Sequence, residues 1–261
     1  MTPTLESWTS VRHRLSEQNK ILLALDFDGT LSEITERPED AVLREGNAPL
    51  LEALGRKPNI IIGILSGRAL NDVSGRVGVP GLIYGGNHGL EIRGPGLDYL
   101  HPAAAAAIPA ISDAAERLVA DLADIPGALV ESKVLTLTAH YRLTPPQYHD
   151  SIAMIFLDTV GPLLATGACR VTAAKMAMEL RPAVDWHKGY ALEMIRFQLA
   201  SDAFPVYFGD DETDEDAYDA AQSVGGIGIY VGPPSTETRA ICRLDSPAAV
   251  SAALADLLAL T

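Results

Sequence analysis

The sequence predicts an α/β protein with a Rossmann-like, doubly wound parallel-sheet core and an inserted α+β domain. Short apolar runs alternate with helical patterns towards both ends of the chain, as in parallel sheets that helices cover on both faces. These runs end in Gly or polar residues, at the strand ends where such sheets bind ligands. The middle of the chain has another order, helix, two strands, helix, two strands, which favours a separate antiparallel sheet.

Four almost continuous apolar segments supply the predicted core strands. They are residues 21–27 (ILLALDF), 59–66 (NIIIGILS), 81–84 (GLIY) and 205–209 (PVYFG). Short apolar runs of this kind, bounded by turn residues, are typical of strands that are buried on both faces. The helical patterns between them cover residues 48–56, 70–77 and 189–199.

The predicted insertion contains an Ala-rich helix, a second helix and four strands. The helices cover residues 102–125 and 146–164, and the strands cover residues 128–133, 134–142, 169–173 and 177–181. Core-like strands resume only after this stretch, so we place its boundaries near Gly89 and Val184. The expected domains are therefore residues 1–88 and 185–261 for the core and residues 89–184 for the insertion.

Composition limits the classes of partner. The 261 residues are 48% hydrophobic, which is ample for buried cores, and 34 acidic against 20 basic residues give a net charge of -14. Such a charge repels nucleic acids and anionic membranes, so we expect neither as a partner. A small anionic substrate is still compatible with this charge if a bound divalent cation and a few Lys or Arg side chains dominate the local field. For the oligomeric state we expect a monomer or a weak dimer.

Cysteine usage and the N-terminal segment indicate a cytoplasmic protein. Cys169 and Cys242 are far apart and have no metal-ligand spacing, so neither a disulfide framework nor a zinc site is expected. The first twenty residues alternate charged with apolar residues, which predicts a short amphipathic helix and not a secretion signal. No stretch approaches the roughly 20 apolar residues of a membrane span.

The most informative segment is Asp26-Phe27-Asp28-Gly29-Thr30-Leu31, directly after the first predicted strand. Two carboxylates two residues apart at a strand end can face one cleft, where one attacks phosphorus and the other handles the leaving-group proton. Two anions facing a phosphate repel it, so this chemistry requires a cation. An isolated Asp after a strand is more often a turn or cap residue, but the complete string favours chemistry.

This segment resembles the first signature of the haloacid dehalogenase superfamily. The resemblance implies a haloacid dehalogenase-like core in which Asp26 is the nucleophile and a metal ligand, and Asp28 is the general acid and base. Ser66-Gly67-Arg68, at the end of the second strand, resembles the position of the superfamily's phosphate-binding Ser or Thr. Lys188, at the start of a helix after the insertion, resembles the third signature. The predicted phosphate-binding residues are Thr30, Ser66, Gly67, Arg68 and Lys188.

The densest acidic cluster in the chain, Gly209-Asp210-Asp211-Glu212-Thr213-Asp214-Glu215, follows the last predicted strand. An acidic helix start explains Asp214 and Glu215 but not all five acids, which repel one another unless a hard cation is present. We expect Mg2+ to be held by Asp26, the backbone carbonyl of Asp28 and Asp210. Asp211 or Asp214 is expected to support these ligands without binding Mg2+ directly.

Further strings resemble the trehalose-6-phosphate phosphatases. They are Gly85-Gly86-Asn87-His88-Gly89-Leu90-Glu91, Val130-Glu131-Ser132-Lys133, His140-Tyr141-Arg142 and Glu179-Leu180-Arg181-Pro182. The likeness extends from about Leu22 to about Gly232 and implies trehalose 6-phosphate as substrate and the insertion as a cap that closes over the sugar. The implied substrate-binding residues are Asn87, His88, Glu131, Lys133, His140 and Arg142. The resemblance implies a Gly after Lys133 in many members of the family, where this chain has Val134, a departure that concerns the shape of the sugar pocket and not the chemistry.

Three alternative functions fit the same sequence. The first is hydrolysis of another sugar phosphate, such as sucrose phosphate or a glycosyl-phosphoglycerate. The second is a phosphosugar mutase, which also forms an aspartyl-phosphate but returns the phosphoryl group to sugar. The third is a non-catalytic sensor, against which the presence of both Asp26 and Asp28 argues, because a binding module has no use for a nucleophile.

Overall fold

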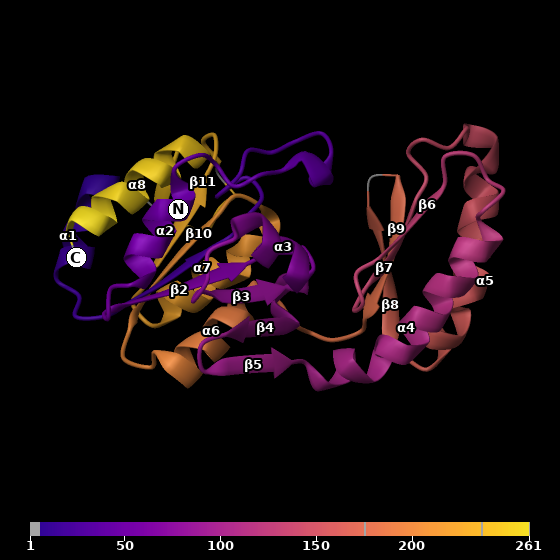
Figure 1. Ribbon diagram of the computed structural model, residues 1–261, viewed down its shortest axis with the longest axis horizontal. Helices are drawn as coiled ribbons and strands as arrows, with labels where there is room; N and C mark the ends of the chain where they lie inside the picture. The colour runs from indigo at the N-terminus through magenta and orange to yellow at the C-terminus, as the bar shows by residue number, and fades with distance from the viewer. Residues whose placement is uncertain (1–5, 175, 236, 261) are drawn as a thin grey trace. The chain divides into compact units, whose positions relative to one another are not determined.

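The computed structural model describes residues 6–174, 176–235 and 237–260, and the chain forms two compact units (Figure 1). The core unit comprises Met1–Tyr99 and Trp186–Thr261, and the cap unit comprises Leu100–Asp185. Among the described residues, no helix is long and apolar enough to cross a membrane.

The core unit is built on an eight-stranded sheet with the order β12-β11-β10-β1-β2-β3-β4-β5. Its strands are β1 (Ile21–Leu25), β2 (Ile60–Leu65), β3 (Ile83–Gly86), β4 (Glu91–Gly94), β5 (Leu97–Leu100), β10 (Phe204–Gly209), β11 (Ile227–Val231) and β12 (Cys242–Leu244). The pairs from β12 across to β3 are parallel, and β4 pairs antiparallel with β3. This sheet confirms the predicted fold class, and β1 lies at its centre.

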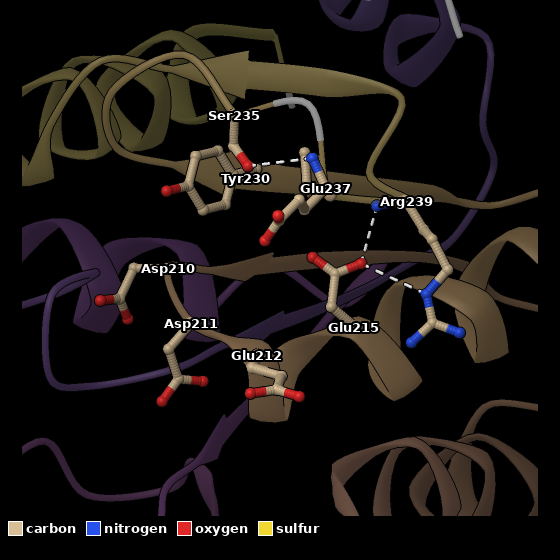
Figure 2. Close-up of a pocket in the computed structure, with 9 residues that line it drawn as sticks. Asp210, Asp211, Glu212, Glu215, Tyr230, Ser235, Glu237 and Arg239 are labelled. Carbon is tan, nitrogen blue, oxygen red and sulfur yellow. Dashed lines mark hydrogen bonds and ion pairs between the residues drawn. The ribbon is translucent and has the colours of Figure 1, made fainter. Parts of the chain in front are cut away.

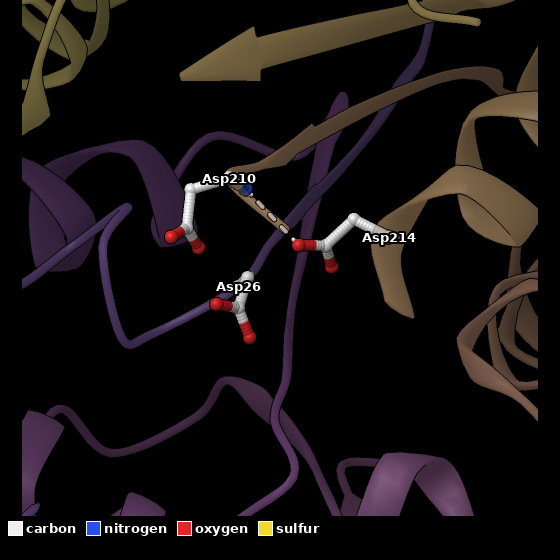
Figure 3. A group of neighbouring side chains, drawn as sticks. All are labelled: Asp26, Asp210 and Asp214. Atoms are coloured by element: carbon white, nitrogen blue, oxygen red, sulfur yellow. Dashed lines mark hydrogen bonds between the residues drawn. The ribbon is translucent and has the colours of Figure 1, made fainter. Parts of the chain in front are cut away.

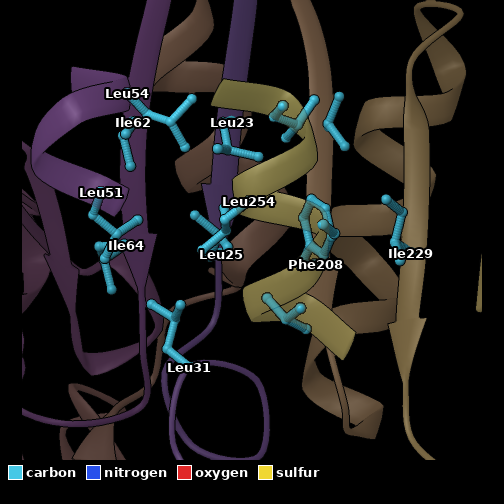
Figure 4. Close-up of a cluster of buried hydrophobic side chains, with 14 of the residues drawn as sticks. Leu23, Leu25, Leu31, Leu51, Leu54, Ile62, Ile64, Phe208, Ile229 and Leu254 are labelled. Atoms are coloured by element: carbon cyan, nitrogen blue, oxygen red, sulfur yellow. The ribbon is translucent and has the colours of Figure 1, made fainter. Parts of the chain in front are cut away.

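Helices cover both faces of this sheet because alternate residues of β1 are apolar on both sides. Leu23 and Leu25 pack with α1 (Trp8–Ser16), α2 (Asn47–Gly55), α3 (Leu70–Val77) and α8 (Pro247–Leu260), as Figure 4 shows for Leu254 of α8. Leu22 and Ala24 pack on the opposite face with α6 (Lys188–Leu199) and α7 (Glu215–Ser223). A strand buried in this way gains about 1.5 to 3 kcal/mol for each large apolar side chain removed from water. That burial fixes where β1 ends, and so where Asp26 begins the loop.

The cap unit is an antiparallel four-stranded sheet with two long helices. The strand order is β6-β7-β9-β8, and the elements are α4 (Pro102–Asp121), β6 (Leu129–Ser132), β7 (Leu137–His140), α5 (His149–Ala165), β8 (Cys169–Ala174) and β9 (Ala177–Pro182). Leu137, Ala139 and Leu180 pack with apolar residues of α4 and α5. Because side chains alternate along a strand, Thr138, His140 and Glu179 lie on the other face of the sheet. We call that polar side the open face.

The structure corrects the first predicted boundary. The insertion begins after Tyr99 and not near Gly89, because β4 and β5 extend the core sheet beyond β3. These strands are short and polar in part, so their sequence gave no clear strand pattern.

Several element ends also differ from the prediction. The helix predicted over residues 102–125 ends at Asp121, and the helix predicted from residue 146 begins with a 3-10 turn, Pro146–Tyr148. The strand predicted over residues 134–142 begins only at Leu137, because Val134 has a left-handed backbone with φ of +68° and forms part of a turn. The core strands β11 and β12 and the C-terminal helix α8 were not predicted.

Candidate active site

The site forms where three adjacent parallel strands end. Asp26 follows β1, Ser66 follows β2 and Asp210 follows β10, and β1 pairs with both of the other strands. The Asp26 N–H donates to the carbonyl of Phe208 at 2.8 Å, which extends the pairing by one residue. This hydrogen bond fixes the backbone of Asp26 and holds its side chain at the sheet edge, where it is only 4% exposed.

Lys188 joins two buried carboxylates. Its Nζ donates to Asp26 Oδ1 at 2.8 Å and to Asp214 Oδ1 at 2.7 Å, and the side chain is almost completely buried. Burial lowers the pKa of Lys188, but the charges of Asp214 and Asp26 outweigh it and raise the pKa above its ordinary value. The ammonium therefore stays charged and fixes the position of the Asp26 carboxylate.

Asp214 is committed to protein contacts. Its Oδ1 accepts hydrogen bonds from Lys188 Nζ and from the Tyr207 hydroxyl, the latter at 2.7 Å. Its Oδ2 accepts from the backbone N–H groups of Asp210 and Asp211, at 3.0 and 3.2 Å. Asp214 thus orients the loop that carries Asp210. The Asp211 side chain instead accepts from Thr213 and caps the following turn.

Asp26, Asp210 and Asp214 gather in a group that fits a cation (Figure 3). Each offers one oxygen, and these oxygens lie within 4.8 Å of one another. Burial raises the pKa of Asp26, and burial together with Asp214 and Asp211 raises the pKa of Asp210 to about 7. One lysine does not balance three carboxylates, so a divalent cation would relieve the repulsion. Oxygen ligands of this type suit Mg2+, and Asp26 and Asp210 are the carboxylates that protein donors leave available for it.

Gly29 brings the loop after β1 against Asp210. Its φ is +74°, and a Cβ at this position would overlap Asp210 Oδ2. Both the left-handed backbone and the close approach require a residue without a side chain. Gly29 therefore determines how closely the loop carrying Asp28 approaches Asp210.

Asp28 does not join the acidic group and is instead bound by Arg68. Arg68 Nε donates to Asp28 Oδ2 at 2.7 Å, and Nη2 donates to Asp28 Oδ1 at 2.6 Å. Arg68 also binds Asp72 and the carbonyl of Pro38. Arg68, predicted to bind phosphate, is therefore committed to carboxylates in this structure.

The remaining predicted phosphate-binding residues lie at the ends of β1 and β2. Ser66 is fully buried, and its hydroxyl accepts from the Arg68 N–H at 3.1 Å. The Thr30 hydroxyl is buried and has no hydrogen-bond partner among the described residues. At the start of α3, the Leu70 N–H donates to Glu91 at 2.9 Å.

Asn87, His88 and Gly89 form a left-handed turn after β3. Their φ angles are +49°, +58° and +87°, which is unusual for consecutive residues and strained for the two that are not Gly. Asn87 Nδ2 donates to Glu91 at 2.8 Å and ties the turn to β4. His88 lies against Gly67, where a Cβ would approach the imidazole to 2.8 Å. The strained turn thus places His88 beside the predicted phosphate-binding loop.

In the cap unit, three of the four predicted sugar-binding residues lie together. Glu131 contacts His140 Nε2 at 3.0 Å and Lys133 Nζ at 3.8 Å. Arg142 is exposed beyond the end of β7 and forms no ion pair with the described residues. The strand register places Thr138 and Glu179 in one row with Glu131 on the open face. Thr138 and Glu179 were not among the predicted sugar-binding residues, although the alternation of β7 and β9 could have indicated them.

A cavity of about 410 Å³ lies beside Asp210 (Figure 2). Its lining residues are Asp210, Asp211, Glu212, Glu215, Tyr230, Ser235, Glu237, Thr238 and Arg239. Glu215 accepts from the backbone N–H of Arg239 at 2.7 Å and from its guanidinium at 3.3 Å. The wall of the cavity is therefore mainly acidic, with Arg239 already bound to acidic groups.

Comparisons with known proteins identify relatives of this chain. The sequence profile of a family described as trehalose-phosphatase matches residues 24–247. The trehalose-phosphate phosphatases of Mycobacterium marinum and Mycobacterium tuberculosis are 40% identical to this chain over 236 residues, which cover 87% of this chain and 58% of each relative. The chain thus spans little more than half the length of these relatives.

Solved structures show a similar fold. The C-terminal domain of the Candida albicans trehalose-6-phosphate phosphatase has a TM-score of 0.75 at 24% identity, covering 100% of this chain and 99% of that one. The Aspergillus fumigatus trehalose-6-phosphate phosphatase has a TM-score of 0.66 at 26% identity, covering 100% of both chains.

Proposed function

The chain belongs to the trehalose-phosphatase family, and we propose that it hydrolyses trehalose 6-phosphate to trehalose and phosphate through a phosphorylated Asp26. The observation that carries this proposal is the buried Asp26 carboxylate, held by Lys188 at 2.8 Å and grouped with Asp210 at a strand end. An ionised carboxylate in that position is a suitable nucleophile for a phosphate monoester.

The proposed reaction has two halves. In the first, an oxygen of Asp26 forms a bond to phosphorus while the bond to the sugar oxygen breaks, and Asp28 gives that oxygen a proton. In the second, Asp28 takes a proton from water, and the water oxygen displaces phosphate from Asp26. Lys188 balances the charge that develops on the phosphoryl group, and the Ser66 hydroxyl lies at the adjacent strand end to bind its oxygens.

Magnesium is the proposed cofactor. Asp26, Asp210 and the backbone carbonyl of Asp28 would hold it. Asp214, which accepts a hydrogen bond from the Asp210 N–H, would fix the loop that carries Asp210. Bound there, the ion would neutralise the repulsion between the acidic group and the incoming phosphate.

For the sugar we propose the open face of the cap sheet. Glu131, His140 and Lys133 present acceptors and donors within one group, which suits the many hydroxyls of a disaccharide. Asn87 and His88 are proposed to contact the substrate beside the phosphate-binding loop. A structural role of the Glu131 group as a cross-strand ion pair is the alternative.

Two other activities are alternatives to this proposal. Phosphatases of sucrose phosphate or of a glycosyl-phosphoglycerate would use the same core residues with a different cap surface. A phosphosugar mutase would also phosphorylate Asp26 but would release little free phosphate. The likeness to trehalose-phosphate phosphatases over 87% of this chain favours trehalose 6-phosphate over both.

The experiment is phosphate release from a panel of phosphates with Mg2+, with a chelator and with Ca2+. The panel contains trehalose 6-phosphate, sucrose 6-phosphate, glucosyl-phosphoglycerate and p-nitrophenyl phosphate. We expect the highest kcat/KM for trehalose 6-phosphate, reversible loss with the chelator, and no rescue by Ca2+, whose larger and looser coordination misplaces the phosphoryl group. Preference for another sugar refutes the substrate, and full activity after exhaustive chelation refutes the metal.

A further inference from the structure

Asp28 and Arg68 form a side-on pair between two loops of the core unit. Both carboxylate oxygens accept from one edge of the guanidinium, at 2.7 Å from Nε and 2.6 Å from Nη2. Two parallel hydrogen bonds of this kind fix the plane of a carboxylate as well as its position. The partners are 40 residues apart, so the pair depends on the tertiary fold.

The rest of Arg68 is held equally firmly. Nη1 donates to Asp72 Oδ2 at 2.9 Å, and Nη2 donates to the Pro38 carbonyl at 2.7 Å. Its guanidinium carbon lies 5.5 Å from the centre of the Phe27 ring. Since a guanidinium has five N–H donors, these contacts and the Asp28 pair leave only one for any other ligand. Arg68 is therefore poorly placed to be a main phosphate ligand.

The backbone of Arg68 is anchored as well. Its N–H donates to Ser66 Oγ, and its carbonyl accepts from the Asn87 N–H at 2.7 Å. Arg68 thus links the ends of β2 and β3 to the loop after β1.

We propose that Arg68 is the positioning residue for Asp28, which holds the carboxylate in the orientation needed for proton transfer. The inference rests on the proposed function, because it assigns Asp28 the role of general acid and base. The side-on pair occupies one lone pair on each oxygen and leaves the others for proton transfer on the side away from Arg68. The Asp28 side chain is 44% exposed, so the contact with Arg68 does not bury it. Without the two hydrogen bonds from Arg68, the carboxylate of Asp28 would rotate about the last torsion of its side chain.

Dependence on the leaving group tests this role. A phosphate ester with a poor leaving group needs a proton from Asp28 when its bond breaks, whereas dinitrophenyl phosphate does not. The measurement is kcat/KM, which reports the first half-reaction, for a series of substituted phenyl phosphates and for trehalose 6-phosphate. For Arg68→Gln we expect a loss of about ten- to a hundredfold with the most basic leaving groups and less than about twofold with dinitrophenyl phosphate.

Two further variants exclude simpler explanations. Arg76→Gln is the matched control, because Arg76 also binds Asp72 but makes no contact with Asp28, and it should retain the wild-type leaving-group dependence. Arg68→Lys keeps the charge but cannot make the two parallel hydrogen bonds of a guanidinium. Its leaving-group dependence should therefore be steeper than that of the wild type.

Three results would overturn the inference. An equal loss on all esters in Arg68→Gln would show that Arg68 binds phosphate or only supports the fold. An unchanged series in Arg68→Gln would show that Asp28 needs no positioning, and full wild-type behaviour of Arg68→Lys would show that charge alone suffices. If the wild type hydrolyses aryl phosphates but not trehalose 6-phosphate, the proposed substrate fails while the role of Arg68 is still measured by the aryl series.

Discussion

At the scale of single residues, Asp214 organises the site without being the proposed nucleophile. It is completely buried and accepts four hydrogen bonds, from Lys188, Tyr207 and two backbone N–H groups. In Asp214→Asn an amide NH2 would face some of these donors and leave Lys188 without one of its counter-charges. We expect the free energy of unfolding to fall by about 3 to 5 kcal/mol.

Urea unfolding followed by tryptophan fluorescence measures this effect, because Trp8 and Trp186 both belong to the core unit. Asp245→Asn, which changes an exposed carboxylate of the same unit, should stay within about 0.5 kcal/mol of the wild type. A loss below about 1 kcal/mol in Asp214→Asn would contradict the role given to this network.

The pKa of Asp210 leads to a prediction for the metal-free protein. The folded value of about 7 exceeds the ordinary 3.8, so between about pH 4 and pH 7 the folded protein keeps a proton that the unfolded chain releases. The free energy of unfolding should therefore decrease as pH rises through this window. The proton belongs to the acidic group as a whole, since Asp26 and Asp214 interact with Asp210.

Urea unfolding at a series of pH values with a chelator present measures that slope. In Asp210→Asn the slope should be smaller. Added Mg2+ should bind more tightly as pH rises towards 7, because it replaces the proton. Equal slopes for the wild type and Asp210→Asn would contradict the pKa shift.

At this scale, the residues of the site were easier to predict from the sequence than the contacts between them. Asp26, Lys188 and Asp210 were predicted because each follows or begins a strongly patterned element, and the structure brings them together. The Arg68 contact with Asp28 was missed, because Ser-Gly-Arg at a strand end also suits a phosphate-binding turn. Only the fold shows that the two loops meet.

At the scale of elements, the turn between β6 and β7 carries strain. Val134 is β-branched and has φ of +68°, a conformation that favours glycine. Its side chain is exposed and so gains little from packing. We expect Val134→Gly to stabilise the cap unit by about 1 kcal/mol.

Hydrogen exchange of the cap amides, measured by mass spectrometry over residues 100–185, tests this prediction. Val134→Gly should slow exchange, and Val119→Gly should accelerate it, because Val119 is also exposed but lies in the helix α4. Faster exchange in Val134→Gly would contradict the assignment of strain.

Substitutions on the open face of the cap sheet test whether this face binds the sugar. Glu131→Ala and Lys133→Ala should each lower kcat/KM for trehalose 6-phosphate by about one to two powers of ten, since a charge-assisted hydrogen bond contributes about 1.5 to 3 kcal/mol. An aryl phosphate without the sugar should be hydrolysed at the wild-type rate. Glu116→Ala, an exposed acid on α4, is the matched control. Equal losses on both substrates would assign the Glu131 group a structural role.

The element boundaries that were mispredicted have local causes. The short strands β4 and β5 are defined by pairing at the sheet edge and not by an apolar pattern of their own. The strands β11 and β12 and the helix α8 lie beyond the last chemical motif. In contrast, β1, β2 and β10 were predictable because burial on both faces requires almost continuous apolar runs.

At the scale of the whole molecule, an acidic protein is proposed to act on an anion. The net charge is -14, and the acidic group and the adjoining acidic cavity lie in the core unit. Lys188 is the cation hydrogen-bonded to Asp26 among the described residues, and Arg68 is bound to Asp28 and Asp72. On the proposed mechanism, a bound divalent ion supplies much of the attraction for the phosphate. The doubly wound fold makes this possible, because it brings strand ends from both parts of the sequence to one edge.

The central claim is that the phosphoryl group passes through Asp26, and trapping it there is the most direct test. Trehalose 6-phosphate is mixed with excess enzyme and Mg2+, quenched in acid within one turnover, and digested for mass spectrometry. We expect trehalose to appear before phosphate, with a phosphorylated peptide that contains Asp26 in the wild type and no such peptide and no turnover in Asp26→Asn. Phosphate release by Asp26→Asn at the wild-type rate, with no phosphorylated peptide in either protein, would contradict the account.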